Sequence, residues 1–194
     1  MRFFEMNKFL FDSVPSSKHL LLLLKLSLLL FPIVLIAVNY AFEISGYPVS
    51  YSESQLSFNG EIIKSHFAVM TQPEVQLYRV AQGVDYFFIL VYGLLIFSLG
   101  VYLGRNFPEK SKFRYLGYIT AISGLIAAFC DAGENLFILL MKFDTSGFPN
   151  SYAIVHFSFA ACKFALLGFS IAAIMVLLIG SLLQKMLPQL DATR

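Results

Sequence analysis

Residues 19–42 read HLLLLLKLSLLLFPIVLIAVNYAF, an apolar run interrupted by one charged side chain, Lys25. A membrane-spanning helix needs roughly 20 such residues, because the hydrocarbon core of a bilayer is about 30 Å thick. Lys25 lies near one end of the run, where its ammonium group can reach the lipid headgroups. Pro32 is expected to kink the helix near its middle. The run therefore predicts a first transmembrane helix.

A cleaved signal peptide is the alternative interpretation, because a basic and polar segment precedes the apolar run. The run is long for the apolar part of a signal peptide, and no clear small-x-small cleavage site follows it. We therefore expect a retained signal-anchor.

Three further runs satisfy the same length requirement, at residues 84–103, 115–141 and 152–183. The whole chain of 194 residues is 58% hydrophobic and 13% charged, with a mean hydropathy of +0.72. A soluble domain carries about a quarter of its residues as charged ones. We predict an all-α membrane protein in which residues 1–194 form a single domain, a bundle of four transmembrane helices.

The basic residues predict the orientation. Ten of the 14 lie between the N-terminus and Lys25, between residues 105 and 114, or in the C-terminal tail. The loop at residues 43–83 instead holds four glutamates and only two basic residues. Loops rich in Lys and Arg stay on the cytoplasmic side, so both termini are predicted to be cytoplasmic. We expect the membrane to be the bacterial inner membrane or a plasma membrane. The clusters of basic residues are separated by apolar runs, which argues against a nucleic-acid partner.

The first outer loop, residues 43–83, is long enough to hold structure of its own. Asn59-Gly60 stands between QLSF and EIIK, and alternating residues around Asn-Gly are typical of a two-residue β-hairpin. We expect a small β-hairpin there, followed by a short amphipathic helix over residues 71–80.

Seven polar residues within the predicted spans are the candidate ligand-binding residues. Ionisable groups at membrane depth are costly and usually face the interior of a bundle, where they mark functional sites. The candidates are Asp85, Tyr92, Asp131, Glu134, Asn135, His156 and Lys163.

Helical spacing brings these residues together. On the third helix the small and polar residues recur every three or four positions and end in Asp131, Glu134 and Asn135. On the fourth helix His156 and Lys163 share a stripe. We expect Lys163 to face the two acids at the floor of an outward-opening cleft, with Asp85 and His156 in a wet vestibule above it. One positive charge against two negative ones leaves a carboxyl group that could hold a proton.

Small residues predict two close helix contacts. The first is a stripe almost opposite the polar one on the fourth helix, which suggests that this helix is packed on two sides. The stripe consists of Ser158, Ala161, Ala165, Gly168 and Ala172. The second is Gly100-x-x-x-Gly104 on the second helix. Cys130 and Cys162 form no C-x-x-C pair and are interpreted as packing residues.

Three classes of function fit this pattern, besides a purely structural ion pair. The first is a site that binds or passes a small or lipophilic ligand or a proton, and it needs no further motif. The second is an intramembrane enzyme acting on a lipid-linked substrate, for which the acids and His156 would supply acid–base groups, although no specific catalytic motif is present. The third is an accessory subunit of a membrane complex, or a homo-oligomer. No metal site is predicted, and the sequence does not identify a cofactor.

Overall fold

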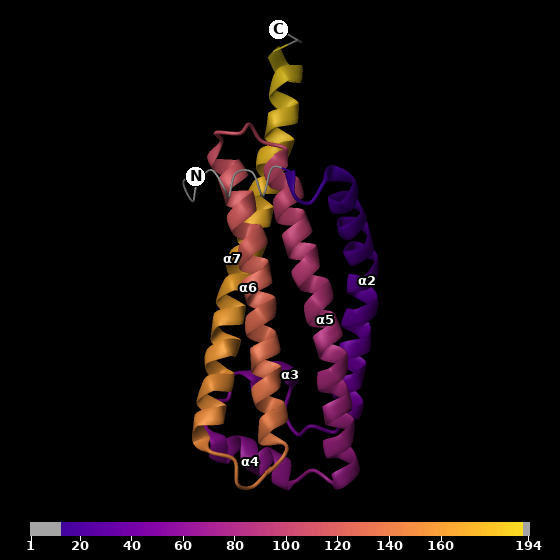
Figure 1. Cartoon of the computed structure of the whole chain (residues 1–194), viewed down its shortest axis with the longest axis vertical. Helices are drawn as coiled ribbons and strands as arrows, with labels where there is room; N and C mark the ends of the chain where they lie inside the picture. Colours follow the sequence, from indigo (N-terminus) through magenta and orange to yellow (C-terminus); the bar gives the residue numbers. More distant parts are fainter. Residues whose placement is uncertain (1–12, 192–194) are drawn as a thin grey trace. The chain divides into compact units, whose positions relative to one another are not determined.

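The computed structural model describes residues 13–191 and is 83% helical, without strands in that part of the chain. Its helices, labelled as in Figure 1, follow one another along the chain. They are α2 (Ser17–Ile44), α3 (Tyr51–Gln55), α4 (Gly60–Ala68), α5 (Gln72–Arg105), α6 (Lys112–Met141) and α7 (Asn150–Asp191).

Four of these helices are long and apolar enough to cross a membrane: α2, α5, α6 and the part of α7 from Asn150 to Met186. They contain the four predicted spans and extend beyond them. The largest extension is in α5, which begins at Gln72 because the side chain of Glu74 accepts hydrogen bonds from the backbone N–H and hydroxyl of Thr71 (2.7 and 2.8 Å). This capping arrangement satisfies backbone donors that the first turn leaves free. The expected helix over residues 71–80 is thus the first part of α5.

The described residues form two compact units. One unit contains residues 13–28, 93–125 and 166–191, and the other contains residues 29–92 and 126–165. All seven candidate residues belong to the second unit, which we call the polar unit. The single membrane domain remains a prediction.

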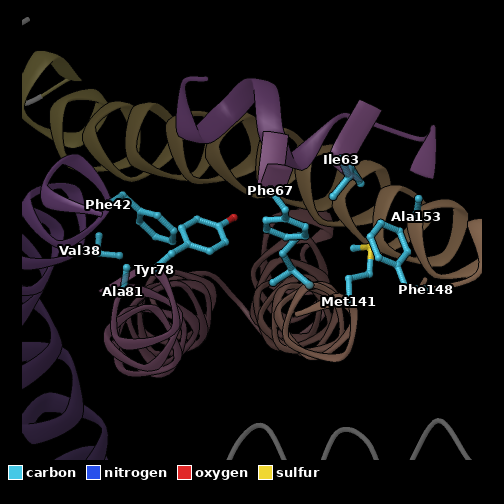
Figure 2. Packing of buried hydrophobic residues seen from close by; sticks show 10 residues of the cluster. Val38, Phe42, Ile63, Phe67, Tyr78, Ala81, Met141, Phe148 and Ala153 are labelled. Carbon is cyan, nitrogen blue, oxygen red and sulfur yellow. The ribbon is translucent and has the colours of Figure 1, made fainter. Parts of the chain in front are cut away.

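The apolar core of the polar unit lies under residues 45–71, which we call the capping segment. Figure 2 shows Phe42 and Tyr78 side by side, and Phe67 beside Met141 and Phe148. The ring centroids of Phe42 and Tyr78 are 5.6 Å apart in an edge-to-face arrangement. These large side chains bury most of their surface, which is the main favourable contribution to folding.

The predicted β-hairpin is wrong, because the capping segment is helical. Asn59 is the N-cap of α4, and its side-chain oxygen accepts a hydrogen bond from the N–H of Glu61 (2.9 Å). Gly60 then opens the helix, and its N–H donates to the side-chain oxygen of Asn150 at the start of α7 (2.7 Å). Asn is a favoured N-cap for the same reason that it favours turns: its short side chain bonds nearby backbone groups. Ile63 and Phe67 lie four residues apart, on one face of α4, and both are buried. This spacing is that of a helix rather than of a strand.

In the other unit, α5 and α6 pack at backbone contact. A Cβ atom added to Gly117 would lie 2.5 Å from the Cα of Gly104, and one added to Gly100 would lie 2.7 Å from the carbonyl oxygen of Gly117. The close contact predicted at Gly100 and Gly104 is therefore present, with Gly117 as its counterpart on α6. Small residues at both faces allow this approach.

The small-residue stripe on α7 does not pack against the other described residues. Ala161, Ala165 and Gly168 are exposed, and a Cβ atom added to Gly168 would meet nothing within 4 Å. The expectation that this helix is packed on two sides is wrong for the described chain. The polar stripe does face inward, because His156, Lys163 and Ser170 are buried.

Candidate functional site

The centre of the polar unit is a buried ion cluster. The ammonium nitrogen of Lys163 on α7 lies 2.9 Å from Oδ1 of Asp131 and 2.5 Å from Oε2 of Glu134, both on α6. Asp131 and Glu134 are three residues apart, so one helix face presents both carboxylates to the same cation. This arrangement is the one expected from the sequence.

Two further hydrogen bonds extend the cluster to α5. The hydroxyl of Tyr92 donates to Oδ2 of Asp131 (2.9 Å), and the side-chain amide of Asn135 donates to Oδ2 of Asp85 (2.7 Å). Three helices therefore supply the ionisable groups. The cluster thus has one cation, Lys163, and three carboxyl groups.

Asp85 and His156 do not line a wet vestibule as expected, because their exposed fractions are 0% and 2%. His156 is covered by the capping segment: its Nε2 lies 3.4 Å from the carbonyl oxygen of Ser54, and its Nδ1 lies 3.3 Å from that of Glu134. A neutral imidazole has one N–H to share between these two acceptors, whereas an imidazolium donates to both. His156 thus joins the capping segment to the helix that carries the ion cluster.

Two aromatic rings and one amine form a stack close to Ser54. The rings of Tyr47 and Tyr78 are parallel with centroids 4.5 Å apart. The amine of Lys142 lies 3.3 Å from the centroid of the Tyr78 ring. A stacked ring and an amine at these distances cannot share one face, so Tyr78 is covered on both faces and only its phenol edge remains.

Lys142 is an unusual buried amine. Its side-chain nitrogen has no hydrogen-bond acceptor among the described residues, and its backbone carbonyl accepts from Arg79 (2.7 Å). Burial, assisted by the positive charge of Arg79, lowers the pKa of Lys142 to about 6. A cation–π contact with Tyr78 contributes about 2 kcal/mol or somewhat more at a buried site, which is less than the cost of burying an unpaired ammonium group. Lys142 is therefore neutral at pH 7.

A pocket of about 440 Å³ opens beside this stack. Its volume falls within the range of small-molecule sites, about 300–1,000 Å³. The end of α2, the start of the capping segment and α5 line it, with the residues Asn39, Phe42, Glu43, Tyr47, Val49, Ser50, Ser54 and Tyr78.

The pocket shares two residues with the polar network beneath it. The phenol of Tyr78 is close to the side chains of Gln82 and Ser54. The backbone carbonyl of Ser54 is one of the two acceptors beside His156. Polar groups therefore continue from the pocket through Tyr78 and Ser54 to His156, whose other ring nitrogen faces the backbone carbonyl of Glu134.

Comparison with protein-family models, curated proteins and solved structures finds no match to this chain. Within residues 13–191 no group of three or more His, Cys, Asp or Glu residues is arranged to hold a metal ion. The chemistry of the site thus has to be argued from its own residues.

The charged residues within the predicted spans gave no indication of the pocket or of the Lys142 stack. Tyr47 and the other lining residues of the capping segment lie outside the spans. Lys142 directly follows the last residue of α6. One observation could have singled it out: it is a lone cation between an apolar run and the stretch FDTSGF, with a single nearby acid, Asp144. The carboxylate of Asp144 accepts hydrogen bonds from the hydroxyl of Ser146 and from the backbone N–H of Gly147, and these bonds lower its pKa. Its hydrogen bonds are thus made within its own loop.

Proposed function

We propose that the chain is a multi-pass membrane protein that binds a small amphiphilic ligand in the pocket beside Tyr78. Both termini lie in the cytoplasm in this proposal, so the capping segment and the pocket face the outside. The ion cluster of Asp131, Glu134 and Lys163 then lies beneath the ligand and exchanges a proton with it or responds to it.

The observation that carries this proposal is the sharing of Tyr78 and Ser54 between the pocket and the buried network. A purely structural ion pair needs two or three residues, whereas this network continues from the pair to an open pocket. Buried polar groups are retained at a cost in stability, and those at membrane depth usually mark a pathway or a ligand site.

The pocket can be tested by filling it. Val49 lines the pocket and does not belong to the polar network, so Val49→Trp should occupy the space without removing a charge. Val69→Trp is the matched control, because Val69 is 70% exposed and lies outside the pocket. Mass spectrometry of gently purified protein should find a co-purifying molecule in the wild type and in Val69→Trp, and lose it in Val49→Trp. Equal retention by both variants would rule out this pocket as the site.

An accessory subunit of a membrane complex is the second candidate, favoured by the exposed small-residue stripe on α7. Such a stripe suits close contact with another helix. Enlarging Ala161 and Ala165 to Leu would then abolish assembly while leaving ligand retention intact. A ligand-binding protein that acts alone would show no loss of function in that variant.

A further inference from the structure

We infer that the pocket beside Tyr78 binds an organic ammonium group, either as a lipid headgroup or as a free amine. This inference rests on the proposed function and names the chemical class of the ligand. Glu43, Phe42 and Tyr47 would provide the contacts that recognise the positive charge.

The charges of the pocket lining favour a cationic ligand. Glu43 lines the pocket, is exposed to it, and has no ion-pair partner among residues 13–191. No Lys, Arg or His residue lines the pocket. An anionic ligand would meet an unpaired carboxylate with no compensating cation, whereas a cation would neutralise it.

Aromatic surface supplies the second contact. Phe42 and Tyr47 both line the pocket and both contact the ring of Tyr78, Phe42 in an edge-to-face arrangement and Tyr47 in a stacked one. Aromatic rings bind quaternary and other organic ammonium groups through the negative potential of their faces. A carboxylate beside such rings favours an organic cation over a hydrated metal ion, because a metal ion would require several oxygen ligands.

The basic groups around the pocket do not oppose a bound cation. Lys142 stands behind the ring of Tyr78, but burial keeps it neutral at pH 7. Lys64 is paired with Glu61 at 2.9 Å, and Arg79 donates to a backbone carbonyl. The remaining polar lining, which includes Asn39 and Ser50, suits the hydroxyl or phosphoester part of an amphiphile rather than an acyl chain.

The position of Glu43 relates the pocket to a lipid surface. Glu43 is the second-last residue of α2, one of the four helices of membrane length. Ionisable residues at the end of a spanning helix lie at the level of the headgroups. A headgroup ammonium of a bilayer lipid and a free amine in the surrounding water would both reach this level.

The test compares choline with 3,3-dimethylbutan-1-ol, an uncharged molecule of the same shape, by calorimetric titration of the full chain in uncharged detergent. Choline should bind and the alcohol should not. Glu43→Gln should weaken choline binding at least about tenfold, a change of about 1.4 kcal/mol. Glu53→Gln is the matched control, because Glu53 lies on α3 and lines a different pocket, and it should change the affinity less than twofold.

The outcomes separate this inference from the proposed function. Equal binding of choline and the alcohol, or unchanged choline binding by Glu43→Gln, would overturn the ammonium assignment. If the molecule that co-purifies with the wild type is still lost in Val49→Trp, the proposed function stands despite that result. If choline binds and Val49→Trp abolishes it, both are supported.

A further titration in nanodiscs identifies the source of the ammonium group. Phosphatidylcholine nanodiscs that suppress choline binding, compared with phosphatidylglycerol nanodiscs, would support a lipid headgroup. Equal choline binding in the two kinds of nanodisc would support a free amine.

Discussion

Replacing Lys163 by Met removes the only cation of the buried cluster and keeps the volume of the side chain. Two carboxylates then lose a partner, at 2.9 Å for Asp131 and 2.5 Å for Glu134. Breaking a buried pair by removing one member costs about 3–5 kcal/mol, because an uncompensated charge is left behind. The free energy of unfolding should fall by that amount.

A second substitution shows which carboxylate bears the loss. Asp131 keeps the hydrogen bond from the hydroxyl of Tyr92, and such a bond to a charged group contributes about 1.5–3 kcal/mol. The side chain of Glu134 has no donor other than Lys163 among the described residues. Adding Glu134→Gln to Lys163→Met should therefore restore most of the stability, whereas adding Asp131→Asn should restore less.

Equilibrium unfolding in mixed micelles with increasing dodecyl sulfate measures these differences, and a double-mutant cycle gives the coupling energy directly. The reasoning is refuted if Lys163→Met unfolds like the wild type. It is also refuted if Asp131→Asn rescues Lys163→Met as well as Glu134→Gln does.

Three other predictions follow from the orientation, the buried amine and the glycine contact. In a cysteine-free background, cysteines placed at Ser52 and Lys110 should react with impermeant reagents from opposite sides of the membrane; reaction of both from the outside would contradict the four-span arrangement. Because the pKa of Lys142 is lowered to about 6 in the folded state, the unfolded chain binds more protons between about pH 6 and 10, so stability should rise with pH by up to about 1.4 kcal/mol per unit. Lys142→Met should remove this slope and stabilise the protein at pH 7. If the free energy of unfolding depends on pH in the same way in the wild type and in Lys142→Met, the prediction is wrong. Gly117→Leu should destabilise by about 1–3 kcal/mol or more through backbone overlap, while Gly168→Leu, which meets nothing, should change thermal stability little.

The long helices and the ion cluster could be predicted from the sequence because both depend on local spacing. Apolar runs of about 20 residues indicate spanning helices on their own. Asp131 and Glu134, three residues apart, must share a face of α6, and Lys163 is the one cation of the fourth span at a comparable depth.

The capping segment could not be predicted in the same way, because tertiary contacts decided its structure. Asn59-Gly60 fits a hairpin turn and a helix start equally well at the level of local chemistry. The contact of Gly60 with Asn150, 90 residues later, and the burial of Ile63 favour the helix. The burial of His156 has the same origin, since Ser54 of that segment lies against it.

The exposure of the small-residue stripe on α7 could not be predicted from the sequence either. Ala161, Ala165 and Gly168 show that another helix can approach closely, but not whether that helix belongs to the same chain. Within the described residues no such helix covers the stripe.

A high-resolution map of the chain in lipid nanodiscs would show what occupies the pocket beside Tyr78. We expect density that belongs to no residue of the chain in the pocket, touching Glu43 and the phenol edge of Tyr78. A pocket filled by the protein's own side chains, with any bound molecule located elsewhere, would contradict this expectation.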